Sequence, residues 1–242
     1  MKLLLFPHSH YCEKGRWALD YKELSYQAVP LLPGFHIRTV RKYAPGSSVP
    51  VLLTGEAVVQ GSSEIIDFLD QRYQKKKLTP DSDEEQQLCR EFETWGDATL
   101  GVPLRQILYH RLLAYPFFIC RCFTYEMDWM RKLVFMLSYP MVRKRIHQVY
   151  VRSEEEVAEA HRIFAGGLQK LEEKLDDREF LVGEGFTRAD LSIASMLSIL
   201  VLPVEHPFPW GEIPDPEIRN FRKTHRNRQF FQWVERIYRD HR

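Results

Sequence analysis

Cysteine is scarce in this chain of 242 residues, which contains only Cys12, Cys89, Cys120 and Cys122. Four cysteines in a chain of this length do not make a disulfide scaffold, and the length is enough to bury a sizeable core without one. The apolar run at residues 3–6 is shorter than the hydrophobic part of a secretory signal. We therefore expect reduced thiols and a cytoplasmic protein.

Long hydrophobic runs and an excess of charge are missing as well. No stretch of about 18 consecutive apolar residues occurs, so no membrane span is predicted. The nearest candidate, residues 112–142, is interrupted by charged residues and by Pro116 and Pro140. The 34 Lys and Arg against 33 Asp and Glu leave a net charge of +1. That balance gives the chain as a whole no attraction to nucleic acid or to an anionic membrane.

Residues 1–76 carry the pattern of an α/β domain. We expect strands at residues 2–6 and 26–29, a hairpin at 51–54 and 57–59, and helices at 10–21, 35–43 and 62–74. The run of lysines at 75–77 and the polar stretch around Pro80 break this periodicity. We therefore place a linker at residues 77–84.

Residues 85–242 are predicted to form an all-helical domain. We expect one helix over 84–113, bent near Gly101 and Pro103, and another over 116–140 that continues to residue 150. Capping-box patterns at Ser153 and Thr187 open two further helices, and a last helix covers 228–239. The helix after Thr187 is apolar nearly all round, which is typical of the buried centre of a domain.

Ser9 and Cys12 stand at the start of the first expected helix. A helix N-terminus has free N–H groups and partial positive charge, which stabilise a thiolate, and a neighbouring hydroxyl can donate a hydrogen bond to it. Ser9 is thus a candidate for activating a bound thiol, or simply the helix cap. Cys12 is a candidate redox thiol, or a small buried residue. A metal at His8, His10 and Cys12 is not expected, since no fourth ligand is near.

Four motifs together resemble the cytosolic glutathione transferase superfamily. They are the Ser-x-x-Cys-x-Lys-x-Arg run from Ser9, the Val49-Pro50 pair, the Gln60-Gly61-Ser62-Ser63 segment before Phe68-Leu69, and the segment from Gly183 to Asp190. The first is similar to the serine-type motif of omega-like and tau-like members. The resemblance implies a thioredoxin-like N-terminal domain followed by an all-α domain, and it extends over the whole chain as in a divergent, bacterial-like member.

This resemblance also implies roles for particular residues. Ser9 would activate the glutathione thiol, and Val49, before a cis Pro50, would pair with the cysteinyl part. The γ-glutamyl part would bind Gln60, Ser62 and Ser63, although Gly61 stands where the family has an acidic residue. The glycyl carboxylate would lie near a basic helix, and an apolar electrophile would meet side chains of both domains. His36 and Arg38 are the residues implied for the glycyl carboxylate. Tyr11, Arg105 and Tyr109 are the residues implied for the electrophile.

The function expected from this resemblance is a glutathione transferase acting in detoxification. Glutathione would be the cosubstrate, no metal would be needed, and the protein would be a homodimer. Two alternatives stay open: a glutathione-dependent thiol reductase or peroxidase that uses Cys12, and a non-catalytic ligand-binding or scaffold protein with the same fold. The second substrate and the role of residues 113–152, which are longer than usual in the family, are left open.

Overall fold

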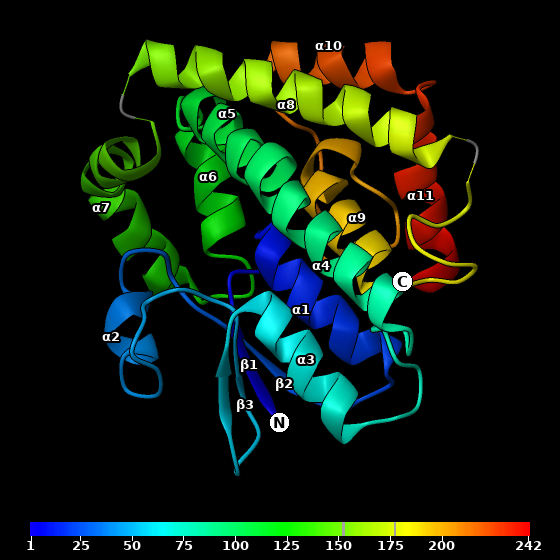
Figure 1. Cartoon of the computed structure of the whole chain (residues 1–242). Coiled ribbons are helices and arrows are strands. Elements are labelled where there is room, and N and C mark those ends of the chain that lie inside the picture. The colour runs from blue at the N-terminus through cyan, green and yellow to red at the C-terminus, as the bar shows by residue number, and fades with distance from the viewer. Residues whose placement is uncertain (152, 177) are drawn as a thin grey trace.

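The computed structural model describes residues 1–151, 153–176 and 178–242. A sheet with its helices forms the first part of the chain, and helices form the rest, stacked against that first part (Figure 1). The fold is thus a thioredoxin-like domain followed by an all-helical domain, as the sequence predicts.

The sheet has the strand order β2-β1-β3-β4. Its strands are β1 (Lys2–Leu5), β2 (Gln27–Pro30), β3 (Val51–Leu53) and β4 (Val58–Gln60). β1 pairs in parallel with β2 and antiparallel with β3, and β3 pairs antiparallel with β4. The parallel pair needs a crossover connection, which the helix α1 (His10–Tyr21) provides.

Both faces of this sheet are covered. Successive side chains of a strand point to opposite faces, so the continuous apolar run of β1 needs a partner on each side. Leu3 and Leu5 belong to the main core with α1 and with α3 (Ser62–Arg72). Leu4 packs instead with Val40 of α2 (His36–Val40) on the other face.

Residues 73–82 connect the two domains. The Asp70 carboxylate, near the end of α3, accepts hydrogen bonds from Leu78 N at 3.1 Å and Thr79 N at 2.7 Å. Lys22 Nζ, buried beside it, lies 2.8 Å from Asp70. The connection is therefore attached to the first domain instead of hanging free.

The helical domain begins with α4 (Asp83–Gly96), which passes through a π-helical turn at Asp97–Gly101 into α5 (Val102–Leu112). This π-helical turn ends at Gly101, two residues before Pro103, where the sequence predicted a bend. The remaining helices are α6 (Pro116–Phe123), α7 (Trp129–Tyr150), α8 (Glu154–Leu175), α9 (Arg188–Val201), α10 (Pro216–His225) and α11 (Gln229–His241). Among the helices that the structure describes, none has both the length and the apolar character to cross a bilayer.

The helix α9 is the buried centre of this domain and packs against α1, α4 and α11. It starts with the predicted capping box, in which the Thr187 side chain accepts a backbone N–H from the first turn. In return, Asp190 Oδ2 accepts from Thr187 N at 2.9 Å. Because α9 lies directly on α1, the two domains share one continuous apolar core.

Two helix predictions need correction. The helix expected over 116–150 is two helices, because the chain turns at residues 124–128, where Glu126 adopts a left-handed φ of 60°. Asp128 then caps α7 by accepting from Arg131 N at 2.9 Å. The helix α10 was not predicted, although Asp215 followed by a proline at the first helical position is a common helix start.

Candidate active site

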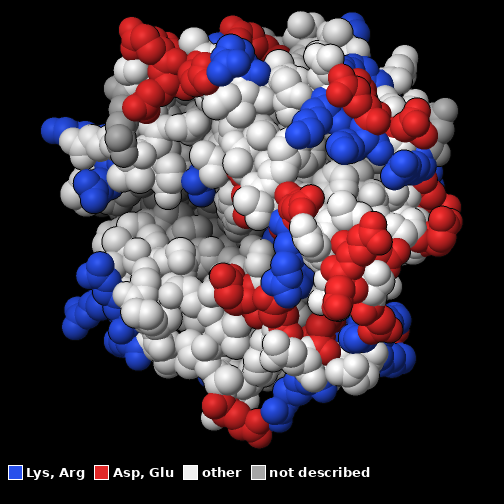
Figure 2. Space-filling view, viewed as in Figure 1, with Lys and Arg blue, Asp and Glu red and all other residues white. Residues whose placement is uncertain are grey.

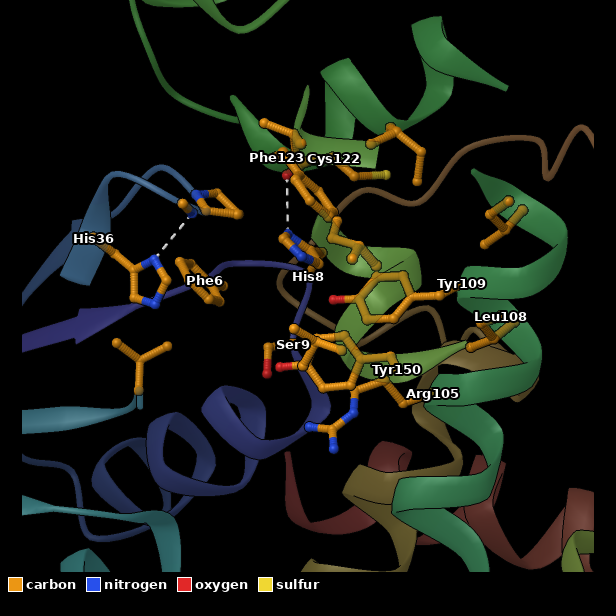
Figure 3. A pocket seen from close by; sticks show the side chains of 18 of the residues that line it. Phe6, His8, Ser9, His36, Arg105, Leu108, Tyr109, Cys122, Phe123 and Tyr150 are labelled. Carbon is orange, nitrogen blue, oxygen red and sulfur yellow. Dashed lines mark hydrogen bonds between the residues drawn. The ribbon is translucent and has the colours of Figure 1, made fainter. Parts of the chain in front are cut away.

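A cavity of about 690 Å³ lies between the two domains. The start of α1 and the loops at residues 33–37 and 47–49 form one side of it, and α5, α6 and α7 form the other. Figure 3 shows side chains from both domains pointing into this space. Among the predicted site residues, Ser9, Tyr11, His36, Val49, Arg105 and Tyr109 line it.

Ser9 is both the cap of α1 and part of the cavity wall. Its backbone is extended, and its Oγ accepts a hydrogen bond from Cys12 N at 3.4 Å. A hydroxyl that accepts from the helix still has its own hydrogen to donate to a group in the cavity. Ser9 can therefore be both the cap of the helix and a candidate for activating a bound thiol.

Cys12 lies elsewhere, in the core under α1. Its side chain is 1% exposed, does not line the cavity, and accepts a hydrogen bond from Phe6 N at 3.3 Å. Burial raises the pKa of this thiol to about 12. Three residues past the cap, the side chain points inward, so the placement does not support Cys12 as a catalytic thiol.

Two histidines beside Ser9 are also buried. His8 stacks on Phe123 at 4.5 Å between ring centroids, and its Nδ1 donates to Cys122 O at 3.1 Å. Burial lowers the pKa of His8 to about 4. Burial, and next the charge of Arg105, lower the pKa of His10 to about 3. Both rings are thus neutral at pH 7, and His8, which lines the cavity, was missed as a site residue.

Arg105 brings a positive charge into the cavity. Its guanidinium lies over the rings of Tyr150 at 4.7 Å and Tyr11 at 5.6 Å. Its Nε is buried without a hydrogen-bond partner, and no carboxylate of the described residues lies within salt-bridge distance. Figure 3 shows Arg105, Tyr150, Tyr109 and Ser9 around the same part of the cavity. This group offers a cation and hydroxyls to a ligand held beside Ser9.

Val49 presents backbone to the cavity next to a cis peptide bond with Pro50. Pro50 itself is buried, and its carbonyl accepts from Gly61 N at 3.0 Å. Within the described part of the chain, no backbone hydrogen bond uses Val49. An extended ligand can therefore pair with this residue in the way that a strand joins a sheet edge.

Gln60, Ser62 and Ser63 lie outside the cavity. Gln60 holds the nearby loop, since its side chain accepts from Gly46 N at 3.2 Å and donates to Ser48 O at 2.9 Å. Ser63 Oγ accepts from Lys14 Nζ at 2.8 Å, so it belongs to a buried network between the domains. Ser62 is the buried first residue of α3, a helix without a side-chain cap.

Glu64 is a further residue at this helix start that the sequence analysis missed. Gly61 has a left-handed φ of 111°, and a Cβ at position 61 would overlap the Glu64 carboxylate. The carboxylate therefore occupies the space of the side chain that position 61 lacks. The sequence does contain a signal for Glu64: a glycine stands where the family has an acidic residue, and a glutamate follows three residues later.

His36 and Arg38 come from the same short helix but lie on different sides of it. His36 lines the cavity, packs edge-to-face on Phe6 at 4.7 Å, and has a pKa that burial lowers. Arg38 is exposed in a separate shallow hollow with Arg41 and Lys42. Among the described residues, no group of three or more His, Cys, Asp or Glu side chains is placed to hold a metal ion.

Comparison with known families agrees with this architecture. A glutathione S-transferase N-terminal domain matches residues 3–77, and a glutathione S-transferase C-terminal domain matches residues 129–229. The chain belongs to the glutathione S-transferase family. The second match spans α7 to the start of α11, so of the three helices on the second cavity wall it includes α7 and leaves out α5 and α6.

Solved structures share this transferase fold at low sequence identity. A glutathione S-transferase from Methylobacterium radiotolerans, in complex with glutathione sulfonate, is 21% identical, with a TM-score of 0.60 over 96% of this chain and 92% of that one. One from Methylobacillus flagellatus with glutathione bound is 18% identical, with a TM-score of 0.60 over 96% and 98%. The β-etherase of Sphingobium sp. strain SYK-6 is 19% identical, with a TM-score of 0.63 over 96% and 97%. A search of curated proteins finds no match.

Proposed function

We propose that the protein is a glutathione transferase that joins the glutathione sulfur to a hydrophobic electrophile. The observation that carries this proposal is the position of Ser9, a hydroxyl at a helix N-terminus on the wall of a cavity shared by both domains. The structures from Methylobacterium and Methylobacillus, which hold glutathione sulfonate and glutathione, support a glutathione site in this fold.

The N-terminal domain offers a partner for each part of glutathione. The backbone of Val49 pairs with the cysteinyl residue, and the uncapped start of α3 at Ser62 receives the γ-glutamyl carboxylate. Glu64 takes the ammonium group of the same residue, in the place of the acidic side chain that Gly61 lacks. His36 faces the glycyl end.

Ser9 and the N-terminus of α1 lower the pKa of the bound thiol, which is about 8.5 when free. The hydroxyl donates a hydrogen bond to the thiolate, and the helix supplies partial positive charge. The thiol proton leaves to solvent, the sulfur forms a bond to the electrophilic carbon, and the leaving group departs with its electron pair. Arg105 stabilises negative charge that develops on the electrophile, because its guanidinium lies in this cavity with a buried Nε that has no hydrogen-bond partner.

The helical domain selects the electrophile. Apolar side chains dominate the far wall of the cavity, which suits a hydrophobic molecule with a small polar part near Arg105. These residues include Leu108, Leu112, Phe118, Ile119, Phe123 and Ile146. One of the solved structures that share this fold is a β-etherase.

Titration of glutathione into wild type and Ser9→Ala tests this proposal, with the thiolate absorbance of the bound ligand followed against pH. We expect wild type to bind glutathione with a thiol pKa at least about one unit below the free value, because Ser9 and the helix favour the thiolate. In Ser9→Ala binding persists and the thiol pKa returns toward the free value.

The control is Cys12→Ala, which changes the neighbouring thiol and leaves the cavity intact. It keeps turnover if Ser9 is the activating group, and it abolishes turnover if the protein is a thiol reductase that uses Cys12. If neither wild type nor Ser9→Ala binds glutathione, the transferase proposal fails and a non-catalytic binding protein takes its place.

A further inference from the structure

Two segments far apart in the sequence flank the cavity. Phe35 and Ile37, at α2, line it from one side, and Met141, Arg145 and Val149 of α7 line it from the other. We call residues 35–43 and 129–149 together the cavity rim. Apart from His36 and Ile146, which face the cavity itself, the rim takes no part in the glutathione chemistry proposed above.

The rim exposes large apolar side chains. On α7, Trp129 is 71% exposed, Leu137 is 76% exposed and Met141 is 65% exposed. With Met130, Leu133 and Val134 they follow helical spacing on the side opposite the buried Phe135, Tyr139, Val142 and Ile146. Phe35 and Tyr43 add exposed aromatic rings at α2. Scattered exposed apolar residues are ordinary, but a continuous face marks an interaction site.

The rim also concentrates positive charge. It contains no Asp or Glu, although the whole chain is balanced at 34 basic and 33 acidic residues. Its cations are Arg38, Arg41, Lys42, Arg131, Lys132, Arg143, Lys144 and Arg145. Acidic side chains flank α7 at Glu126 and Asp128, of which Asp128 pairs with Arg131, and at the start of α8. Figure 2 shows Lys and Arg on both sides of the hollow that lies between α7 and α2 in Figure 1.

We propose that the cavity rim docks on the surface of an anionic phospholipid bilayer. Exposed apolar side chains bordered by cations are what binds a protein in the plane of a lipid interface. A second copy of the chain does not fit the same face, because a symmetric contact would bring one basic rim against the other. The docked protein lies on the bilayer without a spanning helix, and its apolar cavity opens toward the lipid, where hydrophobic molecules concentrate.

Flotation with lipid vesicles tests this docking, and it needs neither glutathione nor turnover. Wild type is mixed with vesicles of phosphatidylcholine alone, and with vesicles that contain about 30% phosphatidylserine. We expect the protein to float with the anionic vesicles and to remain below with the neutral ones. Raising the salt from about 0.05 M to about 0.5 M releases it, because the attraction between charges is screened.

Variants of the rim separate its two contributions. The apolar pair Leu133→Ser with Leu137→Ser lowers the partition coefficient at least about tenfold, since both side chains lose their burial in the interface. The triple variant Arg41→Gln, Lys42→Gln and Lys144→Gln lowers it about fivefold for each cation removed. All five positions are exposed, so unchanged urea midpoints confirm that the variants fold.

The matched control changes the same residue types away from the rim. Val204, which is 96% exposed, becomes serine, and the exposed Lys223 and Arg226 become glutamine. This variant floats like wild type if the rim is the docking surface.

Four results would overturn the proposal. Wild type remains at the bottom of the gradient with anionic vesicles, or the control variant loses flotation as much as the rim variants do. Self-association that the apolar pair abolishes, without vesicle binding, assigns the rim to a second copy. Retention on immobilised polyglutamate without vesicle binding assigns it to an acidic protein.

Discussion

Ser9 and Glu64 each meet a local structural demand, and each has a role in the proposed glutathione site. The Ser9 hydroxyl accepts from the first turn of α1 and still faces the cavity. Glu64 fills the space left by Gly61, whose φ of 111° favours glycine. The acidic group expected at position 61 is therefore supplied from one turn further along α3.

Replacing Glu64 tests whether its carboxylate takes the place of the acidic side chain expected at position 61. Glu64→Gln should weaken glutathione binding about tenfold or more, because a charge-assisted hydrogen bond to the ammonium group contributes about 1.5–3 kcal/mol. The thiol pKa of the bound glutathione should not change, since Ser9 sets it. Calorimetric titration at pH 7 gives the affinity.

The control for this change is Glu184→Gln, at an exposed carboxylate distant from the cavity lining. It should bind glutathione like wild type. Equal affinity in Glu64→Gln would show that the carboxylate merely occupies space beside Gly61.

At the scale of elements, α1 is held on both sides by charged groups that bridge the domains. Lys14 Nζ lies 2.7 Å from Glu93 Oε1, and Arg188 Nε lies 2.9 Å from Glu93 Oε2. Arg188 also pairs with Asp67 of α3. These side chains join α1, α3, α4 and α9, the helices that connect the two domains.

Removing one member of this network should be costly. Arg188→Met leaves two carboxylates of this network, Glu93 and Asp67, with Lys14 as its remaining cation, and we expect a loss of about 3–5 kcal/mol in the free energy of unfolding. Urea unfolding followed by circular dichroism measures it. The comparison is Arg162→Ala, which breaks an exposed pair with Glu159 and should leave the free energy of unfolding nearly unchanged. Similar losses in both variants would contradict a structural role for the buried network.

At the scale of the whole molecule, buried titratable groups make stability depend on pH. His8 has a pKa lowered from 6.5 to about 4 by burial, so below pH 6.5 the unfolded chain binds a proton that the folded chain does not. The stability from neutral His8 is present above pH 6.5 and is lost as the pH falls to about 4. Asp190, with a pKa raised to about 6, acts in the opposite direction below that pH.

The variant His8→Phe isolates the first effect. Between pH 6 and 4.5, its free energy of unfolding should fall less steeply than that of wild type, by about 1.4 kcal/mol per pH unit, because one proton fewer is taken up on unfolding. Urea midpoints across the pH range measure the two slopes. At pH 7 to 8 the two curves should run parallel, and parallel curves below pH 6 would mean that His8 is already protonated in the folded protein.

The sequence by itself determined the features that depend on local chemistry. Turn residues, capping boxes and the apolar run of β1 predict both domains, a bend near Gly101 and Pro103, and the buried helix α9. Ser9 was found because a cap and a helix start are read from neighbouring residues. The turn at residues 124–128 escaped because its left-handed Glu126 is not signalled by glycine or proline.

Only the tertiary structure decided which candidates share the cavity. Cys12 has its hydrogen-bond partner in the core, Gln60 in a loop, and Ser63 between the domains. The residues that provide these partners lie far along the chain or across a helix face. Conversely, Ser9 and Arg105 line the same cavity although 95 residues lie between them in the sequence. Local patterns predict elements because their causes lie within a few residues. A site between two domains depends on how those elements pack, which no single segment encodes.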